Sequence, residues 1–145
     1  MSAKALLFAV AACLICACAQ MPGAPPPSPR PGNTLNCTGA NCDVKVFVKC
    51  DDLIHLFCWI EVDYDWVHVA RGNSPVITWE VRTSGYTFSD NGIAFPSGSP
   101  FRCNAAGKTK FICNDMHTAP GKYKYTITLI GFPFVLPNDP WVDNE

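Results

Sequence analysis

Apolar and polar residues alternate along several short segments of the chain. The clearest are Cys42–Cys50, His55–Asp63, Val76–Arg82 and Lys122–Ile130. In the first of these, three valines alternate with two lysines and a phenylalanine. A period of two is typical of β-strands that bury one face and expose the other. The pattern therefore predicts an all-β domain.

Turn-forming residues separate these segments and set the number of strands. Trp66–Ala70 is predicted to be a short edge strand, and Asp90–Gly92 a turn, because Asn-Gly accepts the positive φ of tight hairpins. The tail after Ile130 contains three prolines and is predicted to be irregular or to lie at a sheet edge. Seven to eight short strands of this kind are typical of an immunoglobulin-like antiparallel β-sandwich. A small Greek-key barrel is the alternative.

Cysteines are frequent in the strand-forming part of the chain, and an even set in a small exported domain predicts disulfides. The set is Cys37, Cys42, Cys50, Cys58, Cys103 and Cys113. Cys103 and Cys113 lie on the two arms of a predicted hairpin, where antiparallel pairing brings them within bonding distance. Cys42 and Cys50 cannot pair, because the two ends of one such strand lie about 27 Å apart. Cys37–Cys42 and Cys50–Cys58 are local alternatives, and crossed pairings among these four stay open.

The N-terminus has the pattern of an export signal. Lys4 is followed by an uncharged apolar run as far as Cys16, which is too short to span a membrane and has the length of a signal-peptide core. We predict a signal peptide over residues 1–19, released at the small residues around Cys18. The sequence before Cys18 also resembles the lipobox of bacterial lipoproteins, in which Cys18 would carry the lipid, and Cys13 is an alternative lipidation site.

A proline-rich stretch follows the leader. Residues 20–36 contain six of the thirteen prolines of the chain, which favours an extended tether and leaves residues 37–145 as the folded domain. Nine cysteines and the leader predict export to the periplasm, attachment to the outer membrane as a lipoprotein, or secretion. A lipid anchor is the one membrane association that we expect. The net charge of −1 gives no electrostatic preference for nucleic acid.

The order of several motifs resembles a known group of proteins. ITWEV, GYTFSDNGIAF, PGKYKYTITL and the terminal DPWV follow one another as in a family of short exported bacterial proteins of unassigned function. This resemblance implies an immunoglobulin-like sandwich and supplies no catalytic residue. A looser resemblance is to cupredoxins, whose copper site requires two histidines, a cysteine and usually a methionine. The residues after Tyr125 contain none of these three types.

Candidate metal ligands occur close together at Cys113, Met116 and His117. Thiolate, thioether and imidazole all suit copper, but a cysteine oxidised to a disulfide offers no thiolate. Met116 and His117 are therefore the residues of the alternative hypothesis, a cupredoxin-like copper-binding protein of the periplasm. The main hypothesis expects no cofactor.

Aromatic residues provide the other candidate site. Trp59, Trp66 and Trp141 lie near charged residues, and exposed aromatics on a rigid sheet are used to recognise sugars and proteins. The sequence contains no Gly-x-Ser-x-Gly, His-Glu-x-x-His or phosphate-loop motif. We expect a non-enzymatic binding or structural domain of the bacterial envelope, whose partner is an unidentified protein or glycan.

Overall fold

The computed structural model describes residues 33–51 and 57–145, which fold as twelve β-strands without an α-helix. The strands are β1 (Thr34–Cys37), β2 (Asn41–Cys50), β3 (Cys58–Val62), β4 (Trp66–Val69), β5 (Val76–Val81), β6 (Thr87–Ala94), β7 (Phe101–Ala105), β8 (Lys110–Asp115), β9 (Gly121–Lys124), β10 (Thr126–Ile130), β11 (Val135–Leu136) and β12 (Trp141–Asn144). Within these residues, no helix has the length and apolarity needed to cross a membrane. The predicted signal peptide, Cys13 and Cys18 lie outside the described residues, as does most of the predicted tether.

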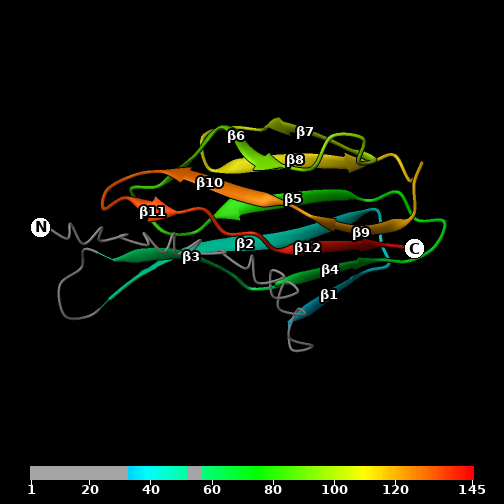
Figure 1. Ribbon diagram of the computed structural model, residues 1–145, viewed down its shortest axis with the longest axis horizontal. Helices are drawn as coiled ribbons and strands as arrows, with labels where there is room; N and C mark the ends of the chain where they lie inside the picture. Colours follow the sequence, from blue (N-terminus) through cyan, green and yellow to red (C-terminus); the bar gives the residue numbers. More distant parts are fainter. Residues whose placement is uncertain (1–32, 52–56) are drawn as a thin grey trace, which may run out of the picture.

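The strands form three sheets whose inward side chains share one core (Figure 1). The largest sheet has six strands in the order β11-β3-β2-β5-β8-β7. A four-stranded sheet has the order β1-β4-β12-β9, and β10 pairs with β6 alone. The predicted all-β sandwich is confirmed, with more strands than the seven to eight that the turn spacing indicated.

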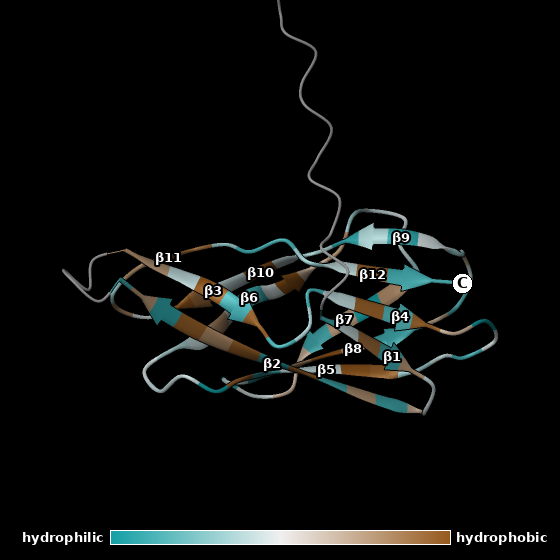
Figure 2. Cartoon of the chain, turned by 90° about the horizontal axis from the view of Figure 1, so that it is seen from below, coloured by the Kyte–Doolittle hydropathy of each residue, from teal (hydrophilic) through white to brown (hydrophobic). Residues whose placement is uncertain are grey.

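Alternation assigned the buried faces correctly. Val44, Val46 and Val48 of β2 are buried, and the residues between them face outward. Figure 2 shows the same interleaving of hydrophobic and hydrophilic residues along β2 and β4. At the centre of the core, Trp79 and Tyr125 are fully buried, and the Trp79 Nε1–H donates a hydrogen bond to the Tyr125 hydroxyl over 3.0 Å.

One strand of the tail, β11, lies at a sheet edge as predicted, but two other segments that were assigned to edges lie inside a sheet. β4 is hydrogen-bonded to both β1 and β12, and β12 lies between β4 and β9, so neither is an edge strand. The prolines of the tail end at Pro140, so Trp141–Asn144 is free to donate every backbone N–H to its neighbours. β1 begins at Thr34, within the last residues of the range assigned to the tether.

The sheets are also not purely antiparallel. β1 with β4, β4 with β12, β2 with β5, and β3 with β11 all pair in parallel. The alternation of a strand shows which face it buries, and it carries no information about the direction of the neighbouring strand.

The predicted turn at Asp90–Gly92 is wrong, because these residues lie within β6. The pairing of β6 with β10 changes register here: Phe88 is opposite Leu129, whereas Ile93 is opposite Ile127. Gly92 is buried, and a Cβ added to it would lie 2.6 Å from the Cβ of Phe88. Glycine is therefore required at this position by a close approach, and a positive φ plays no part.

The predicted strand Lys122–Ile130 is divided into two strands that belong to different sheets. β9 pairs with β12, and β10 pairs with β6. Tyr125 lies between them, and its backbone N–H donates to the carbonyl of Pro140 over 3.0 Å. The inward face was predicted correctly for Tyr125, Ile127 and Leu129, whereas Tyr123 is only partly buried.

Three disulfides join the six cysteines of the domain. Cys103 and Cys113 are opposite each other in the β7–β8 pair, with Cα atoms 4.0 Å apart, as predicted. The two local alternatives are also present, Cys37–Cys42 and Cys50–Cys58, with Cα separations of 5.8 Å and 4.0 Å. Three disulfides in one small domain indicate an oxidising environment outside the cytoplasm.

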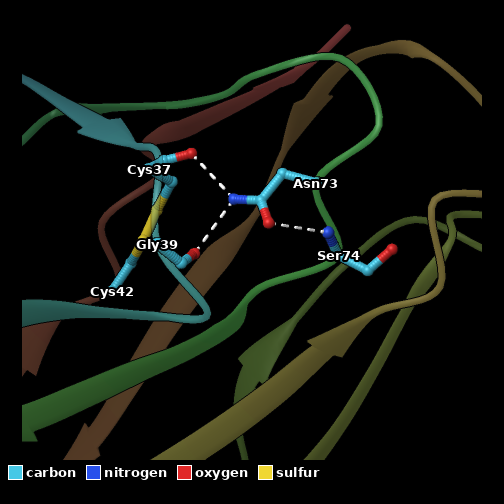
Figure 3. Close-up of a disulfide and its surroundings, with 5 residues drawn as sticks. All are labelled: Cys37, Gly39, Cys42, Asn73 and Ser74. Atoms are coloured by element: carbon cyan, nitrogen blue, oxygen red, sulfur yellow. Dashed lines mark hydrogen bonds between the residues drawn. A yellow bond between two sulfur atoms is a disulfide. The ribbon is translucent and has the colours of Figure 1, made fainter.

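A side chain from a distant loop fixes the first disulfide loop (Figure 3). The Asn73 Nδ2 amide donates to the carbonyls of Cys37 and Gly39, each over 3.0 Å, and its Oδ1 accepts from the Ser74 N–H. The loop between β4 and β5 thereby holds the turn between β1 and β2. This contact adds to the pairing with β4 in holding β1, one of the two edge strands of the four-stranded sheet.

Candidate binding face

The outer side of the four-stranded sheet carries two rows of side chains that run across its strands. Along each strand these residues alternate with buried ones, since β4 and β12 both bury every second residue. The strand register places Thr34, Trp66, Trp141 and Lys124 in the first row. It places Asn36, His68, Asp143 and Lys122 in the second. We call these eight residues the tryptophan face.

Trp66 and Trp141 form the aromatic part of the tryptophan face. They are direct neighbours in the parallel pairing of β4 with β12, and each is partly exposed. Their ring centroids are 6.0 Å apart and their planes are inclined by 30°. The Nζ of Lys122 lies 5.4 Å from the ring centroid of Trp66, within the range of a cation–π contact.

Lys124 lies next to Trp141, at the end of the first row. It is opposite Trp141 in the β9–β12 pairing, and its Nζ lies 3.1 Å from Oδ2 of Asp139. Both partners are nearly half exposed, so this ion pair orients the lysine and adds little stability.

The second row supplies hydrogen-bonding groups. The His68 Nδ1 is 3.8 Å from Oδ2 of Asp143, and its Nε2 is 3.9 Å from Oε2 of Glu145. Both distances are too long for direct hydrogen bonds, and a water or a ligand hydroxyl can bridge each of them. Asn36 adds an exposed amide beside His68.

A polar pocket of about 430 Å³ adjoins the tryptophan face beyond β1. Asn36 belongs to both. The pocket is lined by Leu35, Asn36, Thr38, Gly39, Asn41, Cys42, Asp43, Lys45, Asp63 and Tyr64. Most of these residues offer a hydrogen-bond donor or acceptor, and the N–H of Lys45 donates to Oδ1 of Asp63 over 2.8 Å.

The structure brings together two of the three predicted tryptophans. Trp59 lies on the six-stranded sheet, where its neighbours in register are Lys49 and Leu136. It is about half exposed and does not belong to the tryptophan face. His68, Asp143 and Lys122 were missed because their relation to the tryptophans depends on parallel pairing between distant segments.

The alternative metal ligands are not arranged as a metal site. Cys113 is bonded to Cys103, so it has no thiolate to offer. Met116 is exposed, whereas the Nε2 of His117 accepts a hydrogen bond from the N–H of Gly72 over 3.2 Å. Among the described residues, no group of three or more His, Cys, Asp or Glu side chains is arranged to hold a metal ion.

The carboxyl group of Asp115, two residues before His117, is buried, and this was not predicted from the sequence. Asp115 and Asn144 are almost fully buried. Oδ1 of Asp115 accepts from the His117 backbone N–H over 2.8 Å and from Nδ2 of Asn144 over 3.2 Å. Burial raises the pKa of Asp115, and the interactions with His117 and Asn144 lower it by a smaller amount.

Comparisons with known proteins add little to this description. No family of known proteins matches the chain, so the family resemblance seen in the sequence has no support. None of the curated proteins matches it in sequence. Among solved structures, reduced rusticyanin shows a distant structural similarity, with 15% identity and a TM-score of 0.35 over 77% of this chain and 84% of that chain. A similarity at this level supports no inference about metal or function.

Proposed function

We propose that this chain is an exported, non-enzymatic domain that binds a glycan of the bacterial envelope on the tryptophan face. The observation that carries the proposal is the placement of Trp66 and Trp141 side by side in one row, with a row of polar side chains next to it. The signal peptide and the lipid on Cys18 belong to the same proposal, since they would place the domain in the envelope.

The chemistry of the tryptophan face suits a sugar better than an apolar surface of a protein. A pyranose ring has an apolar face of C–H groups that packs on an indole, and a rim of hydroxyls that requires donors and acceptors. Trp66 and Trp141 supply the first. His68, Asp143 and Asn36 supply the hydrogen-bonding groups for the hydroxyls, and they lie two residues further along the strands than the first row.

The adjoining pocket extends the same chemistry. It shares Asn36 with the tryptophan face and is lined mainly by side chains with amide, carboxylate, hydroxyl or ammonium groups. A glycan that lies across the sheet from Trp141 towards β1 would reach this pocket next. The arrangement therefore favours a chain of several sugars over a single terminal sugar.

Binding to soluble oligosaccharides of the envelope tests the proposal. The probes are oligosaccharides released from peptidoglycan and from lipopolysaccharide, titrated by calorimetry and by the quenching of tryptophan fluorescence. Removing one indole loses a stacking contact of roughly 1–2 kcal/mol, so Trp66→Ala and Trp141→Ala should each weaken binding by about five- to thirtyfold.

Trp59→Ala is the matched control, because it removes an exposed tryptophan from the other sheet. Its affinity for the same oligosaccharide should equal that of the wild type. Equal loss in all three variants, or binding that survives in Trp66→Ala, would refute the assignment to this face. A wild-type protein that binds none of the oligosaccharides would refute the proposed ligand class.

A further inference from the structure

Large apolar side chains are exposed at one end of the molecule, outside the four-stranded sheet that carries the tryptophan face. Of the seven that are exposed among the described residues, six belong to this end, and Met116 is the exception. We call the six the apolar end: Phe57, Trp59, Ile130, Phe132, Phe134 and Leu136. Their exposed fractions range from 49% for Trp59 to 87% for Phe132. In Figure 1 this end is on the left, where β10 leads into β11 beside β3.

The chain holds these side chains outward. The residues between them are anchored: a Cβ on Gly131 would collide with the ring of Tyr86, and Val135 is buried. The hydroxyl of Tyr86 also donates a hydrogen bond to the carbonyl of Pro133 over 2.8 Å. Gly131, Pro133 and Val135 are therefore held against the core. The residues that alternate with them face solvent.

Two strands join the side chains into one surface. Leu136 is opposite Trp59 in the parallel pairing of β11 with β3. Phe57 lies directly before β3 and Phe134 directly before β11, and both are exposed. The alternation of the two strands, continued by one residue, puts Phe57 on the side of Trp59 and Phe134 on the side of Leu136. Phe134 and Leu136 also belong to the segment of chain that carries Ile130 and Phe132.

The exposed area is that of one half of a stable interface. At about 200 Å² for each large apolar side chain, and with about two thirds of each exposed, the six residues present on the order of 800 Å². Apolar patches on monomeric proteins are typically about 300–600 Å². One partner in an interface of standard size contributes about 800 Å².

The charged rim of the apolar end favours a second copy of the chain over a lipid surface. Lys49 is opposite Trp59 in the β2–β3 pairing, and Glu61 is two residues further along the same face of β3. An anionic membrane would select a basic rim. A rim with both signs is self-complementary under a two-fold axis, which places the lysine of one copy near the glutamate of the other.

We propose that the apolar end is the interface of a symmetric homodimer, with Lys49 and Glu61 of the two copies paired across its rim. The dimer would leave the tryptophan face of each copy open, because that face lies on a different sheet. The inference does not depend on glycan binding.

The oligomeric state of the protein, purified with its disulfides intact, tests the proposal. Sedimentation equilibrium and light scattering over about a hundredfold range of concentration should show a monomer–dimer equilibrium. Phe132→Ser combined with Phe134→Ser should weaken the dimer by at least about tenfold. Met116→Ser is the control, since it removes an exposed apolar residue outside the apolar end, and it should leave the dimer unchanged. Near-ultraviolet circular dichroism shows that each variant is folded.

A charge swap separates a specific interface from general stickiness. Lys49→Glu should weaken the dimer, and Lys49→Glu with Glu61→Lys in the same chain should restore it. A wild-type protein that stays monomeric over the whole range overturns the proposal. A monomer that floats with vesicles of phosphatidylethanolamine and phosphatidylglycerol also overturns it and assigns the apolar end to the membrane. A dimer that survives the double serine variant overturns the choice of surface.

Discussion

The hydrogen bond between Trp79 and Tyr125 gives a quantitative test of the core. Trp79 is 0% exposed and Tyr125 1%, and the Trp79 Nε1–H donates to the Tyr125 hydroxyl over 3.0 Å. Tyr125→Phe removes one oxygen and keeps the ring, whose centroid lies 5.2 Å from that of Trp79 and 5.2 Å from that of Phe95. The substitution therefore leaves the packing intact and a buried N–H without its acceptor.

An unsatisfied buried donor costs about 1–3 kcal/mol, so we expect the free energy of unfolding to fall by about 2 kcal/mol. Urea denaturation should show a lower midpoint with an unchanged slope. Tyr123→Phe is the matched control. The Tyr123 hydroxyl donates to the carbonyl of Ala119 over 2.9 Å at a partly exposed position, where water can replace it. Its loss should cost less than about 1 kcal/mol.

A double-mutant cycle separates the hydrogen bond from other effects of the substitution. In the Trp79→Phe background the donor is absent, so Tyr125→Phe should cost much less than it does in the wild type. A loss in the Tyr125→Phe single variant within about 0.5 kcal/mol of that in the Tyr123→Phe control would refute the reasoning. So would equal costs of Tyr125→Phe in the two backgrounds.

Two further predictions concern single positions. Burial raises the pKa of Asp115 above its value in the unfolded chain. The neutral carboxyl group therefore stabilises the fold below about pH 4, and this stabilisation is lost as the pH rises through the folded-state pKa. Asp115→Asn keeps an oxygen that can accept from Asn144 but cannot ionise. The free energy of unfolding of this variant, relative to that of the wild type, should therefore increase as the pH rises from about 4 to 7. A difference in stability that does not change with pH would contradict this. Gly92→Ala should destabilise the domain by about 1–3 kcal/mol because its Cβ meets Phe88. Gly39→Ala, which meets only a carbonyl oxygen at 4.0 Å, should not, and thermal unfolding of the two variants measures the difference.

The sequence was informative wherever the signal is local. The alternation in β2 identified its buried valines, and the hairpin around Gly107 identified the Cys103–Cys113 pair, because both depend on residues that are near in the chain. The two other disulfides were among the alternatives for the same reason, since each closes a loop of fewer than ten residues.

The candidate face was only partly predictable for the opposite reason. Trp66 and Trp141 were selected by residue type, but their contact depends on the parallel pairing of β4 with β12, which nothing in either segment encodes. Trp59 is also a tryptophan on a strand with an exposed face, but it lies on the six-stranded sheet. The strand break at Tyr125 was missed because the apolar alternation continues through it while the hydrogen-bonding partners change from one sheet to another.

The backbone around the two tryptophans shows why the tryptophan face should be formed before a ligand arrives. Trp66 and Trp141 are the first residues of β4 and β12, so a frayed strand end would separate their rings. The carbonyl of Asp65, directly before Trp66, accepts the Trp141 N–H over 3.1 Å. On the other side, the carbonyl of Pro140 accepts the N–H of the buried Tyr125. The residue before each tryptophan therefore accepts a backbone hydrogen bond from a neighbouring segment, and for Pro140 the donor is a residue of the core. A ligand that stacks on this pair does not have to order it, which reduces the entropic cost of binding.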